Sequence, residues 1–183
     1  MKKQSIVLYV LRIALTLLLI TSVVAAALAA VNYITAPIIA QAKADKTQAA
    51  ISEVLEGGGE TIEFDASANP LVKAVYASDK GYAVQVAPSG FDGEIDMMVG
   101  IDLDGNVTKI SVISQTETAG LGAICAAKND KGNTFRDSFV GLSGEVKTAK
   151  DGGEADTITG ATITSRAVAL GVTAALNCVA SLG

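Results

Sequence analysis

The sequence predicts an α+β domain that follows a single N-terminal transmembrane helix. An apolar run long enough to cross a bilayer comes first, then four strand-like segments joined by turn residues, then a segment with helical spacing of apolar residues. Strands grouped before a helix are typical of an antiparallel sheet with helices packed on it. Roughly 140 residues follow the apolar run, enough for one domain with its own core.

The first element is the apolar run from Ile6 to Val31. A helix rises about 1.5 Å per residue, so about 20 residues cross a hydrocarbon core of about 30 Å. The alternative is a signal peptide, with Lys2 and Lys3 as its charged start and the alanines of 25–29 as its cleavage site. The run exceeds the usual signal-peptide core of about 7–15 residues, so we predict a retained anchor. The positive-inside rule then places the N-terminus in the cytoplasm and the rest of the chain outside.

An amphipathic stretch from Ile38 to Leu55 follows Pro37 and is typical of a helix that leaves the membrane. Three glycines, Gly57–Gly59, end this stretch. We therefore expect three parts: a membrane anchor (1–35), a helical stalk (36–59) and an extracytoplasmic domain (60–183).

Two hairpins and a final helix make up the predicted domain. Strand-like segments at 73–78 and 81–87 flank Asp79-Lys80, and those at 95–102 and 107–114 flank the strong turn signal Asp104-Gly105. From Thr164 onward, apolar residues recur at spacings of three and four among several alanines. This change of period predicts a helix packed on the antiparallel sheet.

Composition excludes several classes of function. The net charge of −5 argues against binding nucleic acid, which needs a basic face. The chain has no histidine, so catalysis by histidine and histidine-ligated metal sites are excluded. Cys125 and Cys178 form no CxxC pair, and we expect no metal site. These cysteines form either one disulfide or two buried free thiols.

The segment Asp156-Thr157-Ile158-Thr159-Gly160-Ala161-Thr162 resembles the modification site of the covalent-flavin subunits of ion-pumping oxidoreductases, the Rnf G and Nqr C subunits. In that family FMN is joined as a phosphodiester to the last threonine, which is Thr162 here. The structural alternative is a turn in which Thr159 or Thr162 is an ordinary helix N-cap. Asp156 either helps a flavin transferase to recognise the site, as the resemblance implies, or forms an Asx-turn.

Three more segments carry the same resemblance, in the family's order. Residues 90–102 are similar to the family's Gly-(aromatic)-x-Gly-x-Ile lead into a strand that ends in Val-Gly-Ile-Asp. Residues 117–122 resemble its Glu-Thr-Pro-Gly-Leu-Gly loop, with Ala119 in place of proline, which makes this loop less stiff. Residues 135–141 resemble its Phe-x-x-x-Phe-x-Gly. The resemblance therefore covers nearly the whole chain.

The resemblance implies which residues surround the cofactor. Gly160 and Ala161 are small enough for backbone and phosphate to approach closely, and a helix that begins at Thr162 would offer free N–H groups to the phosphate. Arg166 either faces the phosphate or is an exposed arginine near the helix start. The cofactor-binding set expected around covalent FMN is Thr159, Gly160, Ala161, Thr162, Glu117, Thr118, Leu121 and Gly122, with Asp156 as a motif residue.

The resemblance also implies a function. It is that of the G-type electron-transfer subunit of a membrane-bound, ion-translocating ferredoxin:NAD⁺ oxidoreductase of the Rnf type, with no catalytic residue of its own. The partners implied are the other membrane and iron–sulfur subunits, and a flavin transferase that uses FAD and Mg²⁺. The alternatives are the C-type subunit of a Na⁺-translocating NADH:quinone oxidoreductase, a stand-alone surface flavoprotein anchored in the cell membrane, and an anchored binding domain without redox activity.

Overall fold

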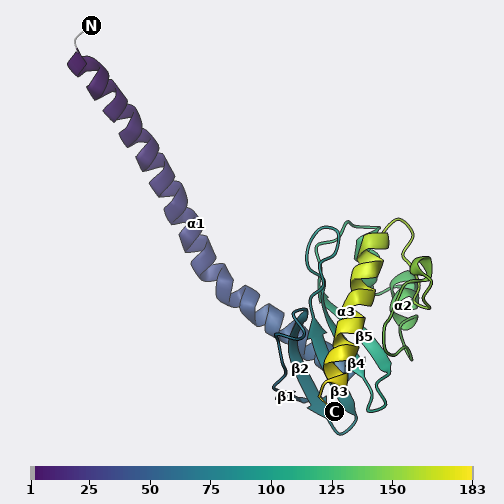
Figure 1. The fold of residues 1–183 in the computed structure, drawn as a ribbon. Coiled ribbons are helices and arrows are strands. Elements are labelled where there is room, and N and C mark those ends of the chain that lie inside the picture. Colours follow the sequence, from purple (N-terminus) through teal and green to yellow (C-terminus); the bar gives the residue numbers. More distant parts are fainter. Residues whose placement is uncertain (1–2, 183) are drawn as a thin grey trace. The chain divides into compact units, whose positions relative to one another are not determined.

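The computed structural model describes residues 3–182 and confirms the predicted α+β architecture behind a long apolar helix (Figure 1). The chain divides into two compact units, Met1–Ala44 and Asp45–Gly183. The elements in chain order are α1 (Lys3–Val54), β1 (Glu60–Ile62), β2 (Val72–Ser78), β3 (Gly81–Val86), β4 (Asp96–Ile101), β5 (Val107–Ser114), the short 3₁₀ helices η1 (Gly122–Ala126) and η2 (Ala149–Asp151), α2 (Asp130–Asp137) between these two, and α3 (Thr162–Ala180).

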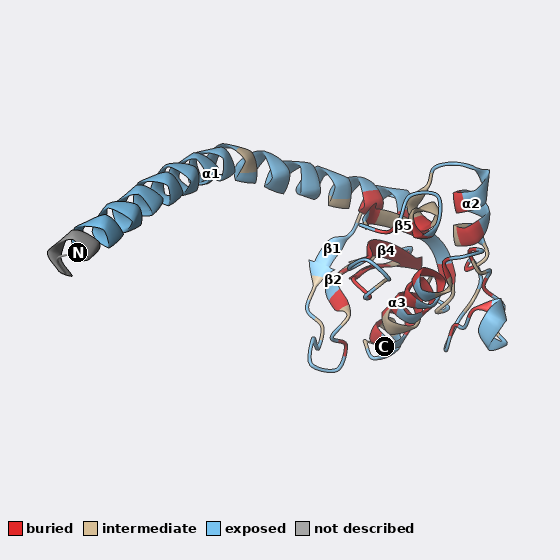
Figure 2. Ribbon diagram, turned by 90° about the horizontal axis from the view of Figure 1, so that it is seen from above, coloured by how far each residue is buried: buried red, intermediate tan, exposed pale blue. Residues whose placement is uncertain are grey.

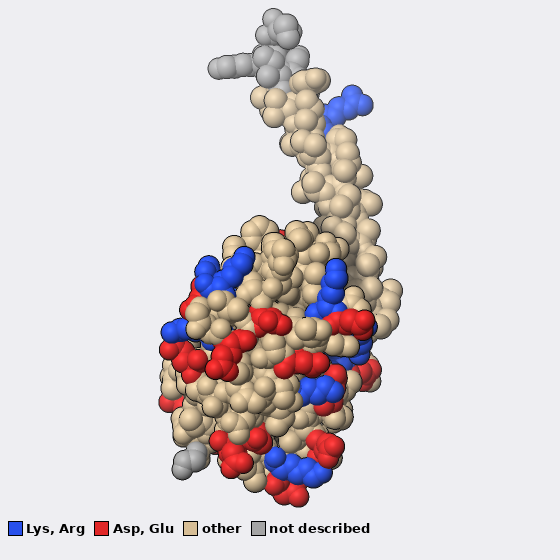
Figure 3. Space-filling model, turned by 90° about the vertical axis from the view of Figure 1, so that its right-hand side faces the viewer, with Lys and Arg blue, Asp and Glu red and all other residues tan. Residues whose placement is uncertain are grey.

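Helix α1 has the length and composition of a membrane span. Its most apolar window of 18 residues has a mean hydropathy of 2.5, and none of that window is buried (Figure 2). Charged side chains are sparse along it in the space-filling view, whereas the domain surface carries many of both signs (Figure 3). Helix α3 is also long and apolar enough to cross a membrane, but 56% of its most apolar window is buried, as in a core helix of a folded domain. Exposed apolar surface on this scale fits α1 for association with a membrane.

Helix α1 continues through Pro37, so the two helical stretches predicted on either side of this proline form one element. Proline removes one helical hydrogen bond and costs about 3 kcal/mol in a helix interior. The alanine-rich sequence that follows Pro37 favours helix and offsets part of that cost.

The sheet is an antiparallel meander of five strands in the order β1-β2-β3-β4-β5. The predicted hairpins are its strands β2–β5, and β1 adds a short edge strand that we did not predict. The register places Val75 opposite Val84, Val84 opposite Val99, and Val99 opposite Ile110. These four side chains are at most 2% exposed, so they form a continuous apolar row across the sheet.

Both faces of the sheet are covered within the domain. The apolar row packs in one cluster with α3, through residues such as Val168 and Val172. The opposite face, at Met98 and Ile113, packs against the last turns of α1. Every residue of β4 is buried because β4 lies between these two layers.

The end of α1 therefore belongs to the domain core. Ala50, Ile51, Val54 and Leu55 are at most 7% exposed and cluster with the sheet. The compact unit begins at Asp45, which lies within the predicted stalk (36–59). The amphipathic pattern of this stretch is explained by its packing against the sheet.

Helix α2 explains the Phe-x-x-x-Phe motif. Asn129 caps the helix by accepting a hydrogen bond from the Gly132 N–H at 3.0 Å. Phe135 and Phe139 then lie on one side and form an edge-to-face pair with ring centroids 5.3 Å apart. Both rings are buried, so this motif is part of the core.

The two cysteines are free, buried thiols, so the second of the two sequence interpretations is correct. Burial, with a smaller contribution from the charge of Glu117, raises the pKa of the Cys125 thiol to about 11. Burial also raises the pKa of Cys178. Both groups stay protonated at neutral pH and pack as small apolar side chains.

Gly100 allows α1 to approach the sheet closely. A Cβ atom at this position would lie 2.7 Å from the Val54 carbonyl oxygen and 2.6 Å from the Thr108 hydroxyl oxygen. No ordinary carbon contact is that short, so a side chain at residue 100 would push the last turn of α1 away from β4.

We predict that Gly100→Ala lowers the free energy of unfolding by about 1–3 kcal/mol, because overpacking separates α1 from the sheet. Urea unfolding of the full chain in mild detergent, followed by circular dichroism, measures the change. Thr108→Ala, which removes only an exposed hydroxyl beside the same glycine, should stay within about 0.5 kcal/mol of the unmodified chain. Equal stabilities of the two variants would contradict the close packing described here.

Candidate functional site

Helix α3 begins at Thr162, the threonine singled out by the sequence motif. Its N-cap residue is Ala161, which offers no side-chain oxygen to the first turn. Neither Thr159 nor Thr162 is therefore the N-cap, which removes that structural alternative. Thr162 is partly exposed, and its hydroxyl accepts a hydrogen bond from the Lys150 ammonium at 2.9 Å.

A turn at Gly160 leads into this helix. Gly160 has a φ of +81°, in the left-handed region that favours glycine. A Cβ here would also lie 3.1 Å from a methyl carbon of Leu121. The small residue thus lets the chain reverse direction directly before Thr162 and beside the loop that carries Leu121.

The other hydroxyls near the helix start are engaged in the fold. Thr164 is 1% exposed and donates a short hydrogen bond to the Glu117 carboxylate. Ser165 is fully buried, accepts from the Ile158 N–H and donates to the Ala161 carbonyl, both at 2.9 Å. Of the three hydroxyls in the first turn of α3, that of Thr162 is the one within reach of a large reagent.

A cavity of about 340 Å³ opens beside Thr162. It brings together seven of the predicted cofactor-binding residues: Glu117, Thr118, Leu121, Gly122, Gly160, Ala161 and Thr162. Three further lining residues were not predicted to bind: Phe91, Ile163 and Thr164. Phe91 was visible in the sequence as the aromatic residue of the Gly90–Gly93 motif, but the pattern did not indicate that it reaches the cavity.

Glu117 holds the cavity together. Its side chain belongs to a residue only 7% exposed, and one oxygen accepts from the Phe91 and Asp92 N–H groups at 2.9 and 3.0 Å. The other oxygen accepts from Thr164. A Cβ at Gly122 would lie 2.5 Å from this second oxygen, so glycine is needed for the carboxylate to fit. One buried carboxylate thus joins three chain segments.

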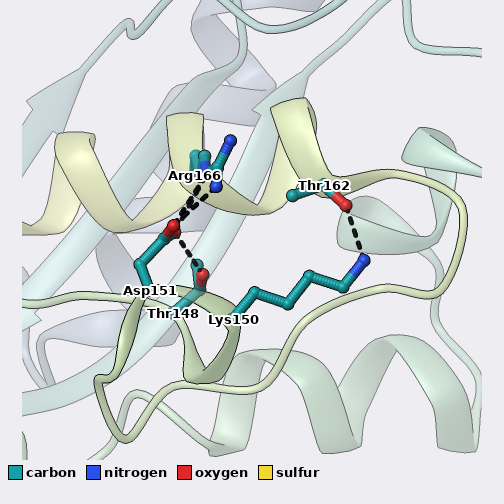
Figure 4. A network of polar contacts seen from close by, with 5 residues as sticks. All are labelled: Thr148, Lys150, Asp151, Thr162 and Arg166. Carbon is teal, nitrogen blue, oxygen red and sulfur yellow. Dashed lines mark hydrogen bonds and ion pairs between the residues drawn. The ribbon is translucent and has the colours of Figure 1, made fainter.

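A polar network flanks Thr162 on the side of η2 (Figure 4). Arg166, one turn after Thr162 in α3, pairs with Asp151 at 2.5–3.1 Å. Hydrogen bonds from Arg166, and then from Thr148, lower the pKa of Asp151 to about 2. Arg166 is therefore directed to Asp151, and Lys150, which the sequence motif did not indicate, is the cation at Thr162.

Asp156 and Thr159 lie at a different place from the other predicted residues. They line a neighbouring cavity of about 620 Å³ together with residues of α2 such as Lys131. The Asp156 N–H donates to the Ser138 hydroxyl at 2.9 Å. Thr159, predicted among the cofactor-binding residues, thus lines this neighbouring cavity, and Gly160 separates it from Thr162.

The cavity suits a large, partly apolar anion. Phe91, Leu121 and Ile163 are 68, 44 and 52% exposed and supply apolar surface for a planar ring. Lys150 and the uncapped start of α3 supply positive charge and N–H donors for a phosphate. Within residues 3–182, no group of three or more metal-ligating side chains is placed to hold a metal ion.

Comparison with known proteins agrees with this chemistry. Residues 90–177 match the family model described as an FMN-binding domain. The G subunit of the Na⁺-translocating ferredoxin:NAD⁺ oxidoreductase complex of Acetobacterium woodii is 34% identical, over 89% of this chain and 88% of the relative. The G subunit of the proton-translocating ferredoxin:NAD⁺ oxidoreductase complex of Clostridium ljungdahlii is 31% identical, over 82% and 80%. The G subunit of the ion-translocating oxidoreductase complex of Methanosarcina acetivorans is 34% identical, over 82% and 85%.

Matches of this identity cover most of this chain and most of each relative. The chain therefore belongs to the family of G subunits of ion-translocating ferredoxin:NAD⁺ oxidoreductase complexes, with an FMN-binding domain at residues 90–177.

Proposed function

We propose that this chain carries electrons through an FMN joined to Thr162 by a phosphodiester, as the G subunit of an Rnf-type complex. The observation that carries the proposal is the reachable Thr162 hydroxyl, which borders a cavity of flavin-compatible lining at the start of α3. FMN supplies reversible oxidation and reduction at its ring system. The residues of the chain bind and orient this group, and none of them makes or breaks a substrate bond.

The cavity residues have distinct parts in this proposal. Leu121, Phe91 and Ile163 contact the ring through apolar surface and exclude water from it. Thr118 offers a hydroxyl to a polar edge of the ring or to the phosphate. Glu117 acts through the fold, since its carboxylate is already engaged by Phe91, Asp92 and Thr164. Attachment through the phosphate leaves the ring chemically unmodified.

Maturation requires a separate flavin transferase in this proposal, one that uses FAD and Mg²⁺. Asp156 and Thr159 are exposed on the segment that precedes Thr162, in the adjoining cavity. Their position supports a role in recognition by the transferase, outside the FMN cavity. Such an arrangement explains why a linear motif includes residues on both sides of the Gly160 turn.

The proposal places the chain in the cell membrane with other subunits. Residues 1–35 form the anchor, and 36–59 lead from it into the domain, whose core includes the last turns of α1. Residues 60–183 hold the FMN cavity on the outer side. A single span encloses no ion path, so the ion-translocating part of the complex lies in partner membrane subunits. Iron–sulfur subunits deliver the electrons.

We predict that Thr162→Val abolishes covalent FMN, because valine keeps the shape of threonine and lacks the hydroxyl. Thr108→Val is the matched control and should keep the adduct, because Thr108 is an exposed threonine of β5 that lines neither the Thr162 cavity nor the neighbouring one. Peptide mass spectrometry after production beside an active transferase gives the readout. An unmodified wild-type Thr162 peptide from those cells would rule out covalent attachment at this residue.

A second prediction concerns partners. Purification of the chain from its source membranes in mild detergent should bring down several multi-span subunits and an iron–sulfur protein, the partners of the proposed complex. Relatives of the chain are named as G subunits of ferredoxin:NAD⁺ oxidoreductase complexes. A tagged unrelated single-span protein serves as control. Recovery of the flavin-loaded chain alone would favour the stand-alone surface flavoprotein.

A third prediction concerns orientation. Alkaline phosphatase joined after Gly183 should be active, and green fluorescent protein joined there should be dark, because the positive-inside rule keeps Lys2 and Lys3 in the cytoplasm. The same reporters placed before Met1 should behave in the opposite way. A bright fluorescent fusion at Gly183 would place the domain in the cytoplasm instead.

A further inference from the structure

Lys150 is the charged side chain that contacts the Thr162 hydroxyl. Its ammonium donates to the Thr162 oxygen at 2.9 Å, and it reaches this oxygen from η2, across from the start of α3 (Figure 4). An ammonium carries three N–H donors and a compact positive charge, which suits an anionic oxygen better than a neutral hydroxyl. The position of Lys150 is therefore suited to a negatively charged oxygen at Thr162.

The position of Lys150 is fixed by its neighbours. Asp151, the next residue in η2, accepts from Arg166 and from the Thr148 hydroxyl, the latter at 2.7 Å. Arg166 and Thr162 are one turn apart on α3, so η2 and α3 are joined by two adjacent polar contacts. The Ala149 N–H also donates to the Ala155 carbonyl at 2.7 Å. This docking directs the Lys150 ammonium to the Thr162 hydroxyl.

We propose that Lys150 is a positioning residue for the phosphoryl group at Thr162. This inference rests on the proposed function. Before attachment, Lys150 holds the hydroxyl oxygen toward the incoming phosphorus. During attachment, the bond from the Thr162 oxygen to the FMN phosphorus of FAD forms, and the bond from that phosphorus to the bridging pyrophosphate oxygen breaks. AMP leaves with the bridging oxygen, and the hydroxyl proton of Thr162 passes to solvent. Lys150 stabilises the negative charge that develops on the oxygen.

After attachment, Lys150 pairs with the phosphodiester. The diester carries one negative charge directly beside the former hydroxyl, within reach of the flexible lysine stem. Arg166 already pairs with Asp151, so Lys150 is the cation that pairs with the phosphodiester charge. Because Lys150 is exposed, added salt should weaken the interaction.

The test uses the full chain in mild detergent with purified transferase, FAD and Mg²⁺. The initial rate of FMN incorporation, followed by intact mass, should fall about tenfold in Lys150→Met, as expected for a partly exposed hydrogen bond to a charged group. Lys150→Arg should restore most of the rate. Lys147→Met is the matched control, an exposed lysine three residues earlier that pairs with Glu145, and should remain within about twofold of wild type.

A second readout is independent of the loading rate. In fully loaded protein, the ³¹P resonance of the diester should shift between wild type and Lys150→Met, and Lys147→Met should leave it unchanged. Thermal unfolding before loading should be equal in all variants. If Lys150→Met unfolds earlier, Lys150→Gln replaces it, because glutamine keeps a polar head without the charge.

The outcomes separate the two proposals. Wild-type loading rate and an unshifted ³¹P resonance in Lys150→Met would overturn the role of Lys150 and leave covalent FMN intact. Wild-type chain that never gains FMN would overturn the proposed function, and the role of Lys150 with it. Both proposals are supported if Lys150→Met gains FMN slowly, Lys150→Arg restores the rate, and the ³¹P resonance of the diester is shifted in Lys150→Met.

Discussion

One buried carboxylate, that of Glu117, holds the site in its shape. It accepts hydrogen bonds from the Phe91 and Asp92 N–H groups and from the Thr164 hydroxyl in α3. A buried charge is tolerated only when hydrogen bonds replace its hydration, so these donors and the carboxylate depend on one another. The cavity beside Thr162 exists because this group fixes the distance between the loop after β5 and the start of α3.

Much of the fold follows from local patterns in the sequence. The Asp104-Gly105 turn and the alternating residues around it predict the β4–β5 hairpin, and the apolar spacing after Thr164 predicts α3. Strand β1 has three residues, too few for a period to show, and exists because it pairs with β2. Helix α2 has only eight residues, most of them polar, so no apolar spacing in the sequence predicts it. The Asn129 cap and the burial of Phe135 stabilise this helix in the fold.

The parts of the site that form short sequence motifs could be predicted. The parts that only the fold brings together could not. The motif around Thr162 and the Glu117–Gly122 loop could be recognised as short strings, and the structure brings both to one cavity. Lys150 belongs to no such string, since its role depends on the docking of η2 by Arg166 and Asp151. Thr159 is close to Thr162 in sequence, yet the left-handed turn at Gly160 places it on another surface.

The packing of the last turns of α1 sets a practical limit on dividing this protein. A soluble fragment cut at Glu60, where the sheet begins, would lose the cover over Met98 and Ile113. Uncovered apolar surface of that kind promotes aggregation in water. A fragment that begins at Asp45 retains Ile51 and Val54 and with them both layers around β4. A fragment designed to be soluble in water should therefore include the last turns of α1, the same helix whose N-terminal part is long and apolar enough to cross a membrane.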